Sequence, residues 1–172
     1  MTDPTHQQAR SIHASLPVID GHNDLPWALR VEAGSDIVAA DPCHFLAGYH
    51  TDVPRLEQGG VGGQFWSVFV PAWDPTPLRT TIEQIDLVQR MTDRCSRLTR
   101  ADSVADVVAA RSTGRTASLM GGEGGHAIEN SLAALRTLRR LGVRYMTLTH
   151  GDTIDWADSA TDEARHGGLT SF

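Results

Sequence analysis

A short apolar segment that ends abruptly in a histidine and a carboxylate constrains this chain more than any other feature. The segment reads VIDGHND and spans residues 18–24. In an extended chain, residues i and i+2 point to the same side, so His22 and Asp24 can converge on one metal ion. An imidazole and a carboxylate suit Zn²⁺ and its divalent neighbours. By itself the spacing favours a loop histidine beside a solvated carboxylate, so a metal site needs support from elsewhere in the chain.

Two later segments repeat the pattern of a strand followed by a metal-compatible side chain. Residues 116–120 (TASLM) read as a short buried strand, and the glycines that follow leave Glu123 on a turn. Taken alone, Glu123 is better explained as a glutamate that faces water. Residues 144–150 (RYMTLTH) again form a strand pattern, which ends in His150. Three strands with such residues at their carboxyl ends predict a (β/α) barrel, in which catalytic residues come from several strand ends.

Several longer motifs resemble the renal, or membrane, dipeptidase family (peptidase family M19). The motifs are VIDGHNDLPW at 18–27, GGQFWSV at 62–68, EGGH at 123–126, and RYMTLTH at 144–150 followed by WAD at 156–158. They occur in the family's order over residues 16–172. The resemblance implies an α/β fold of the (β/α)₈ TIM-barrel type, amidohydrolase-like, and a zinc-dependent dipeptidase.

The resemblance also implies roles for individual residues. Two zinc ions lie side by side in this family; His22 and Asp24 match the ligands of the first, and Glu123 matches the carboxylate that bridges both. His150 matches the histidine that meets the substrate oxygen where charge develops, which assigns His150 and Glu123 to catalysis. The alternative for His150 is a core histidine bonded to the backbone. Trp27 matches a residue near the substrate pocket, although packing against the barrel rim explains an aromatic there nearly as well.

The implied reaction is metal-dependent hydrolysis of a small dipeptide through a hydroxide that bridges the two metals. A metal ion lowers the pKa of its bound water towards 7, and a pair of ions can also polarise the substrate carbonyl. Two alternatives stay open. One is hydrolysis of another small amide, such as an N-acyl amino acid, and the other is a non-catalytic truncated fragment with a partial metal site.

Four further polar residues lie next to these motifs. Asn23 and His126 are expected to orient the ligands by hydrogen bonds. His126 is explained equally well as a residue that packs at a helix start. Asp155 and Asp158 lie in the loop after His150, where solvated carboxylates are the default expectation.

The length of the chain predicts roughly the N-terminal half of a barrel. A (β/α)₈ barrel typically takes about 250 residues, whereas this chain has 172. The resemblance implies that the second metal's histidines, and an arginine and an aspartate that act on substrate, belong to the later half. Residues 1–172 are therefore expected to form a single incomplete catalytic barrel domain that is inactive by itself.

Composition and charge restrict the partners of the chain. The 40% of hydrophobic and 21% of charged residues are typical of a globular protein. A net charge of −6 without a basic stripe argues against nucleic acid. No apolar segment reaches the length of a membrane span, and the polar residues 2–15 do not resemble a secretory signal, so no membrane anchor is expected. A homodimer is left open.

The two cysteines allow at most one disulfide and do not form a CxxC pair. Cys95 lies on the apolar stripe of a predicted helix and is expected to fill the core. A reduced, cytoplasmic setting is the simpler expectation for the protein.

Turn and capping signals predict one βα unit after another. The first half is expected to contain a strand at 16–20, an irregular loop through Tyr49, a short helix from Val53 to Gly59-Gly60 and a strand at 63–70. A helix then runs from a Thr80–Glu83 capping box to Leu98, followed by a helix at 103–111 and the strand at 116–120. The last helix follows Glu123, ends at Gly142 and buries Ile128, Leu132, Leu135, Leu138 and Leu141.

Overall fold

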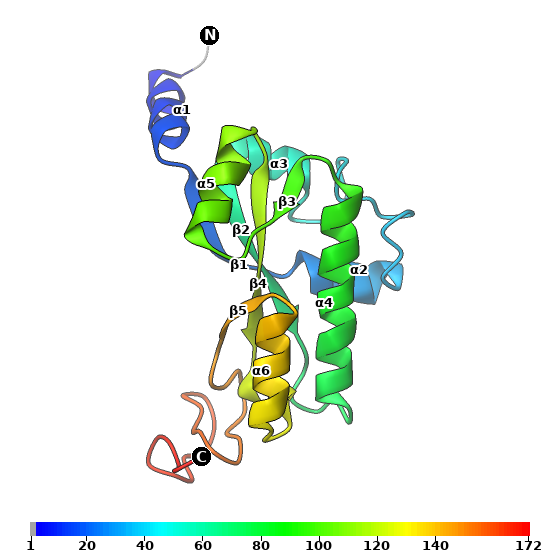
Figure 1. Cartoon of the computed structure of the whole chain (residues 1–172), viewed down its shortest axis with the longest axis vertical. Helices are drawn as coiled ribbons and strands as arrows, with labels where there is room; N and C mark the ends of the chain where they lie inside the picture. Colours follow the sequence, from blue (N-terminus) through cyan, green and yellow to red (C-terminus); the bar gives the residue numbers. More distant parts are fainter. Residues whose placement is uncertain (1–2) are drawn as a thin grey trace.

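The computed structural model describes residues 3–172 and has a five-stranded parallel sheet at its centre (Figure 1). The strands are β1 (Val18–Asn23), β2 (Val61–Phe69), β3 (Leu98–Arg100), β4 (Thr116–Glu123) and β5 (Val143–Met146). The helices are α1 (Pro4–Ser15), α2 (Leu25–Ala33), α3 (Val53–Gly59), α4 (Pro77–Arg94), α5 (Val104–Ser112), the 3₁₀ helix η1 (Gly125–Ile128) and α6 (Leu132–Arg140). No helix within residues 3–172 is long and apolar enough to cross a membrane.

The sheet is ordered β1-β2-β4-β3, and β5 also pairs with β4. β3 pairs with the first residues of β4, and β5 pairs with its later residues. β2 runs beside β4 over its whole length, from the pair Gly63–Ala117 to the pair Phe69–Glu123. The parallel βα organisation predicted from the sequence is therefore confirmed, and β4 is the strand to which most of the sheet is attached.

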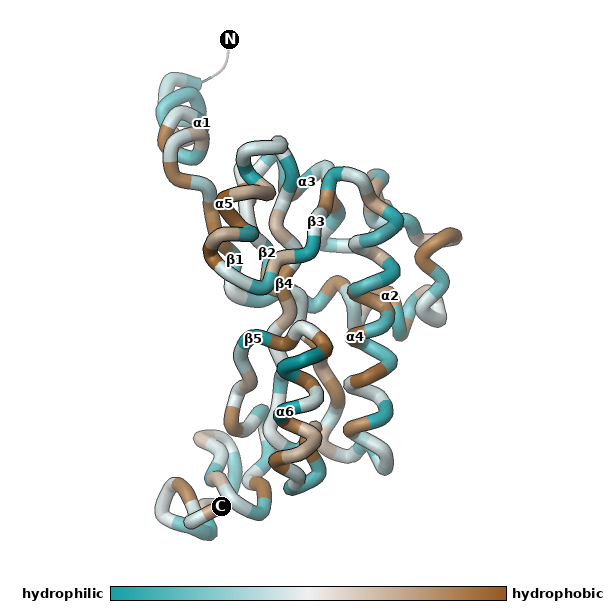
Figure 2. Tube along the Cα trace, viewed as in Figure 1, coloured by the Kyte–Doolittle hydropathy of each residue, from teal (hydrophilic) through white to brown (hydrophobic). Residues whose placement is uncertain are grey.

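Strand β2 is buried on both faces, as a central parallel strand requires. Trp66 and Val68 are fully buried and share the main hydrophobic cluster with Val88 and Met91 of α4. Figure 2 shows apolar and hydrophilic residues alternating along α4, as expected of a helix with one buried side. The opposite face of β2 carries Phe65, whose ring lies 5.3 Å from that of Tyr145 on β5.

The long helix predicted at 80–98 is placed differently. It begins at Pro77 and ends at Arg94, and Leu98 starts a strand instead of closing the helix. The predicted capping box is wrong because the Thr80 hydroxyl donates to Asp74, at 2.8 Å, and does not cap the helix. A proline in the first turn provides the start signal instead.

The polar N-terminal segment, for which the sequence predicts no element, forms α1, which projects from the rest of the molecule (Figure 1). Three other predicted segments differ from the structure. The supposed irregular loop contains α2. The first strand runs from Val18 to Asn23 and not over 16–20. The helix expected after Glu123 is interrupted by Glu129 and Asn130, whose φ angles are positive, so it forms η1 and α6 and leaves Leu132 exposed.

Cys43 and Cys95 are joined by a disulfide, with their Cα atoms 5.4 Å apart. Cys95 is buried in the core, as predicted, but the expectation of two reduced thiols differs from the structure. The bond connects the segment between α2 and α3 to the end of α4. The cytoplasmic location stays a prediction.

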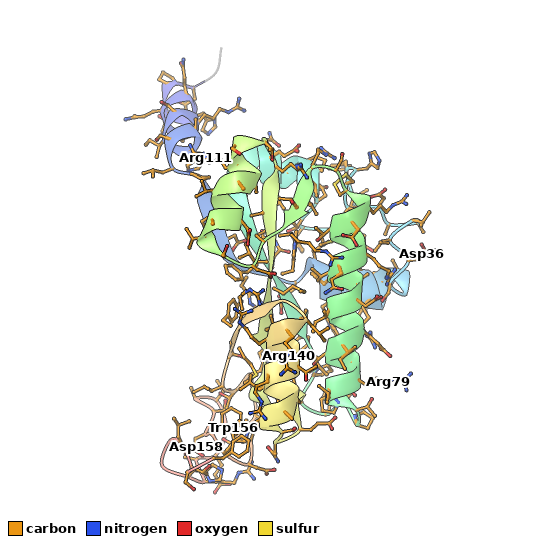
Figure 3. All side chains as sticks on the ribbon, viewed as in Figure 1. Asp36, Arg79, Arg111, Arg140, Trp156 and Asp158 are labelled. Atoms are coloured by element: carbon orange, nitrogen blue, oxygen red, sulfur yellow. A yellow bond between two sulfur atoms is a disulfide. The ribbon has the colours of Figure 1, made fainter. Side chains whose placement is uncertain are left out.

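The loop after β5 is organised by Asp158, which lies near Trp156 in Figure 3. Its carboxylate accepts hydrogen bonds from the backbone N–H groups of Arg165, His166 and Gly168, at 2.8–3.1 Å. These donors hold the pKa of Asp158 at about 2. Asp158 is half-buried, and the default expectation of a solvated carboxylate does not include these backbone contacts. Asp155, by contrast, is exposed and accepts a hydrogen bond from the Asn130 side chain.

Gly121 on β4 makes room for Tyr145, which links β5 to β1. A Cβ atom at Gly121 would lie 2.1 Å from Cζ of Tyr145, whereas at Gly122 the nearest atoms lie 3.5 Å away. The Tyr145 hydroxyl donates to the carbonyl oxygen of Gly21 at 2.7 Å, immediately before His22. The missing side chain at Gly121 thus allows a hydrogen bond between β5 and β1.

We expect Gly121→Ala to lower the free energy of unfolding by about 1–3 kcal/mol, because the added methyl group must displace the Tyr145 ring. Gly122→Ala is the matched control and should have a much smaller effect, since its Cβ makes only ordinary contacts. Urea unfolding of the two variants measures the difference. Equal stabilities would show that Tyr145 is not held in this place.

We expect Asp158→Asn to speed hydrogen exchange at the amides of Arg165, His166 and Gly168, because the neutral side chain is a weaker acceptor. In the unmodified protein, the folded-state pKa of Asp158 lies below the usual 3.8. Its stabilisation of the loop is therefore fully present above about pH 4 and is lost as the pH falls through about 2.

Amide exchange followed by mass spectrometry measures both effects. Asp152→Asn, an exposed aspartate in the same loop, serves as the control and should leave the three amides unchanged. Equal protection in the Asp158 and Asp152 variants would contradict the role assigned to Asp158.

Candidate metal centre

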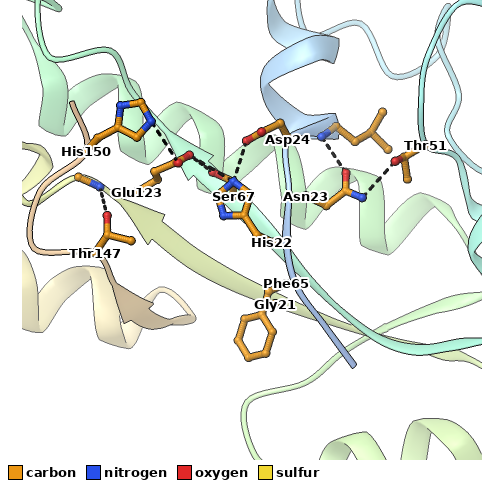
Figure 4. A network of polar contacts seen from close by, with 12 residues as sticks. Gly21, His22, Asn23, Asp24, Thr51, Phe65, Ser67, Glu123, Thr147 and His150 are labelled. Atoms are coloured by element: carbon orange, nitrogen blue, oxygen red, sulfur yellow. Dashed lines mark hydrogen bonds and ion pairs between the residues drawn. The ribbon is translucent and has the colours of Figure 1, made fainter. Parts of the chain in front are cut away.

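Three predicted site residues converge at the carboxyl ends of β1 and β4 (Figure 4). His22 is the penultimate residue of β1, and Asp24 directly precedes α2. Glu123 is the final residue of β4. One nitrogen or oxygen atom from each of the three lies within 4.8 Å of the others. The i, i+2 spacing of His22 and Asp24 therefore has the consequence expected of an extended chain.

The separations of these atoms fit a divalent cation. His22 Nε2 lies 3.2 Å from Asp24 Oδ1 and 3.5 Å from Glu123 Oε2. The ligand atoms of a tetrahedral zinc ion, each about 2.0–2.2 Å from the metal, are about 3.3–3.6 Å from one another. The donor set of one imidazole and two carboxylates also suits zinc. Small movements of these side chains are enough to enclose an ion.

Glu123 is the best-anchored member of the group. Its side chain is 14% exposed, compared with 41% for His22 and 61% for Asp24. The Ser67 hydroxyl donates to Glu123 Oε2 at 2.7 Å, and His150 Nε2 lies 3.4 Å from the other oxygen, Oε1. The two oxygens of one carboxylate thus face different histidines.

The sequence predicts Glu123 on a turn, but the structure places it within a strand. Pairing between β2 and β4 continues to Phe69 and Glu123, and pairing between β4 and β5 continues to Gly122 and Met146. The Ser67 hydroxyl then fixes the carboxylate from the neighbouring strand. A strand-borne carboxylate has fewer conformations than one on a glycine turn.

The electrostatic surroundings of the centre are acidic. Burial raises the pKa of the Tyr145 hydroxyl, and the carboxylates of Glu123, Asp20 and Asp24 raise it further. A raised pKa keeps this hydroxyl protonated, as its hydrogen bond to Gly21 requires. A divalent cation is the natural counterion for such a group of carboxylates.

His150 is near Glu123, although it does not lie at a strand end. β5 ends at Met146, and His150 follows in the loop. The Thr147 hydroxyl accepts a hydrogen bond from Gly124 N at 2.7 Å, which keeps this loop beside the end of β4. The Ser159 hydroxyl bonds to the carbonyl oxygen of His150, at 3.1 Å. These contacts hold the imidazole over Glu123.

Trp27 is connected to the candidate centre by Phe69, which packs against both Trp27 and His150. The Trp27 and Phe69 rings form an edge-to-face pair with centroids 5.0 Å apart, and Phe69 lies 5.1 Å from the His150 ring in a similar arrangement. The three rings form a row from α2 to the loop after β5. Aromatic packing explains this position of Trp27, and its role in substrate binding stays a prediction.

Asn23 and His126 bond to the backbone and to neighbouring loops. Asn23 accepts from Leu25 N at 3.0 Å and donates to the Thr51 hydroxyl at 3.1 Å, which fixes the turn between His22 and Asp24. The His126 ring lies 2.9 Å from the carbonyl oxygen of Val70 and packs at the start of η1. Asn23 thus orients the ligand-bearing turn, whereas His126 matches the packing alternative.

Four residues that contact the centre or its neighbours are not predicted from the sequence: Ser67, Phe69, Tyr145 and Thr147. Ser67 and Phe69 share the face of β2 that carries Phe65, and alternation along this strand is the signal that could have found them. Tyr145 and Thr147 depend on contacts between distant segments. No local pattern marks them.

Comparison with known proteins identifies related chains. The family model for membrane dipeptidase (peptidase family M19) matches residues 6–172. Dipeptidase 3 of Rattus norvegicus is 40% identical over 179 residues, which cover 99% of this chain and 36% of the relative. The solved structure of dipeptidase AC, a metallopeptidase, has a TM-score of 0.66 at 26% identity and covers 83% of this chain and 45% of its own. The probable dipeptidase PvdM of Pseudomonas aeruginosa has a TM-score of 0.79 at 19% identity, with 98% and 46% coverage.

These relatives confirm the predicted family and the α/β fold of the TIM-barrel type. The chain spans between a third and a half of the length of each of the three. Peptidase family M19 is a metallopeptidase family, so the predicted metal dependence holds at the level of the family. On the match over residues 6–172, the chain belongs to the membrane dipeptidase family, peptidase family M19.

Proposed function

We propose that the full-length protein hydrolyses dipeptides with two zinc ions, the first held by His22, Asp24 and Glu123. The observation that carries this proposal is the convergence of these three side chains, within 4.8 Å, at the carboxyl ends of parallel strands. In barrel enzymes the active site lies at this end of the strands. Family membership supports a dipeptide as the substrate.

Peptide hydrolysis needs a stronger nucleophile than neutral water and a more electrophilic carbonyl. When bound, the zinc ions supply both, because they lower the pKa of water and act as Lewis acids. Glu123 is the bridging ligand in this proposal, since its two oxygens face different sides of the centre. Its hydrogen bond from Ser67 holds the carboxylate in one orientation, in which it would be ready to hold an ion.

His150 stabilises the charge that develops on the substrate carbonyl oxygen. Its Nε2 atom lies 3.4 Å from Glu123 Oε1, and His150 is not one of the three residues that would hold the first ion. A hydrogen bond donated from His150 to this oxygen strengthens as the oxygen becomes negative. Trp27 and Phe69 line the approach to His150 in this proposal and exclude water from it. Assembly as a homodimer stays a prediction.

We expect His22→Ala and Asp24→Ala to abolish dipeptide hydrolysis in the full-length protein and to lower its zinc content, because each removes a ligand. Glu123→Gln should lower both zinc occupancy and rate, since it removes the bridging charge. Elemental analysis and a ninhydrin assay with Ala-Ala measure the two quantities on the same samples. His44→Ala, an exposed histidine away from the centre, should match the unmodified protein. Full activity and zinc content in any ligand variant would refute the ligand assignment.

We expect His150→Ala to keep its zinc and to lose about 10²- to 10³-fold in kcat, the usual effect of removing one oxyanion-stabilising donor. The same zinc analysis separates the two roles that a histidine here could have. Loss of zinc from His150→Ala would make His150 a ligand. An unchanged kcat would remove it from catalysis.

A further inference from the structure

A cleft of about 330 Å³ opens directly beside the candidate metal centre. One end is formed by His22 and Asp24, and one wall is a face of α2. The opposite wall is the segment Gly48–Thr51, which precedes α3. The cleft therefore starts at the metal ligands and extends away from them between a helix and a loop.

The wall formed by α2 has a regular arrangement. Asp24, Ala28 and Glu32 are four residues apart and all line the cleft, so they lie on one side of the helix, one above the other. Eight residues of helix rise about 12 Å. Helical side chains lean towards the N-terminus, so a residue at this position lies on the side of α2 that also carries Asp24. The small Ala28 leaves the middle of the cleft open.

The opposite wall is held in place by buried polar contacts. Asp52 is completely buried and accepts hydrogen bonds from the backbone N–H groups of Leu46 and Arg55, both at 2.9 Å. Arg55 pairs with Asp52 at 3.2 Å and donates to the carbonyl oxygen of Tyr49 at 2.5 Å. Thr51 is tied to β1 by the Asn23 side chain. These contacts hold the wall at Gly48–Thr51 in place.

The charge of the cleft is negative at its outer end. Its lining includes no lysine or arginine, and Glu32 takes part in no ion pair within residues 3–172. Burial and the nearby Glu32 carboxylate raise the pKa of the Tyr49 hydroxyl, which therefore stays neutral. Asp24 is committed to the metal in the proposed function. Glu32 is the carboxylate that remains free.

We propose that this cleft is a substrate subsite that selects dipeptides with a basic side chain, with Glu32 as the residue that pairs with the cation. The proposal rests on the proposed function. With the scissile amide at the metals, a lysine side chain reaches along Ala28, and its flexible four-carbon stem carries the ammonium group to Glu32. Norleucine has the same four-carbon stem without the ammonium group, so it occupies the cleft without the charge interaction.

The test compares kcat/KM for lysine and norleucine in X-Ala and Ala-X dipeptides. Because Glu32 is exposed, we expect lysine to be preferred by about two- to fivefold in one of the two series. Added salt should reduce this preference. Glu32→Gln should bring the ratio to about one. Glu163→Gln changes the net charge equally from an exposed site in the C-terminal loop and should leave the ratio unchanged.

Ala28→Leu tests the space separately from the charge. We expect it to lower kcat/KM for both long side chains relative to Ala-Ala, because the added atoms fill the middle of the cleft. Calorimetric binding of non-hydrolysable phosphinate mimics of the lysine and norleucine dipeptides to the zinc-loaded protein gives the same ratio independently of turnover.

The two proposals fail in different ways. Absence of Ala-Ala hydrolysis would refute the proposed dipeptidase, and the binding ratio would still decide the subsite. A lysine-to-norleucine ratio of one in both measurements, or a ratio that survives Glu32→Gln, would overturn the subsite. A preference for Glu-Ala over norleucine-Ala would overturn it as well.

Discussion

The hydrogen bond from Ser67 to Glu123 is the interaction on which the candidate centre depends. It joins two strands that pair in parallel over their full length, and it holds the least exposed carboxylate of the centre. His22 and His150 approach this carboxylate from opposite ends of the described chain. A loop-borne glutamate would have to lose conformational freedom each time it bound a metal. A strand-borne one loses that freedom during folding, so the orientation of Glu123 does not depend on a bound ion.

Small residues make this organisation possible. The glycines at 121 and 122 lie in the interior of β4, where glycine usually weakens a strand. At Gly121 the absent side chain admits the Tyr145 ring, whose hydroxyl bonds to the β1 carbonyl next to His22. Glycine lowers the intrinsic stability of β4, and the hydrogen bond from Tyr145 to Gly21 offsets this loss by connecting β5 to β1. The packing of Tyr145 against Gly121 therefore also positions the backbone beside the candidate ligand His22.

Much of the fold and of the candidate site could be predicted from local patterns. The i, i+2 spacing places His22 and Asp24 together, and the carboxyl ends of parallel strands bring Glu123 to them. What could not be predicted depends on contacts between distant segments. Glu123 lies in a strand because β2 continues pairing to Phe69, and the supposed capping threonine of α4 bonds to Asp74 instead. The three-residue β3 exists because β4 offers it a partner.

The disulfide between Cys43 and Cys95 has a consequence for the denatured chain. The two residues are 52 positions apart, and a covalent link over such a distance removes conformations of the unfolded ensemble worth about 4 kcal/mol at 25 °C. The closed loop contains α3, β2, α4 and the cleft wall at Gly48–Thr51. Reduction would therefore act first on the entropy of the unfolded state, because none of the three candidate ligands lies within the closed loop. The segment between α2 and α3 has no regular structure of its own, and the disulfide fixes it to the C-terminal end of α4.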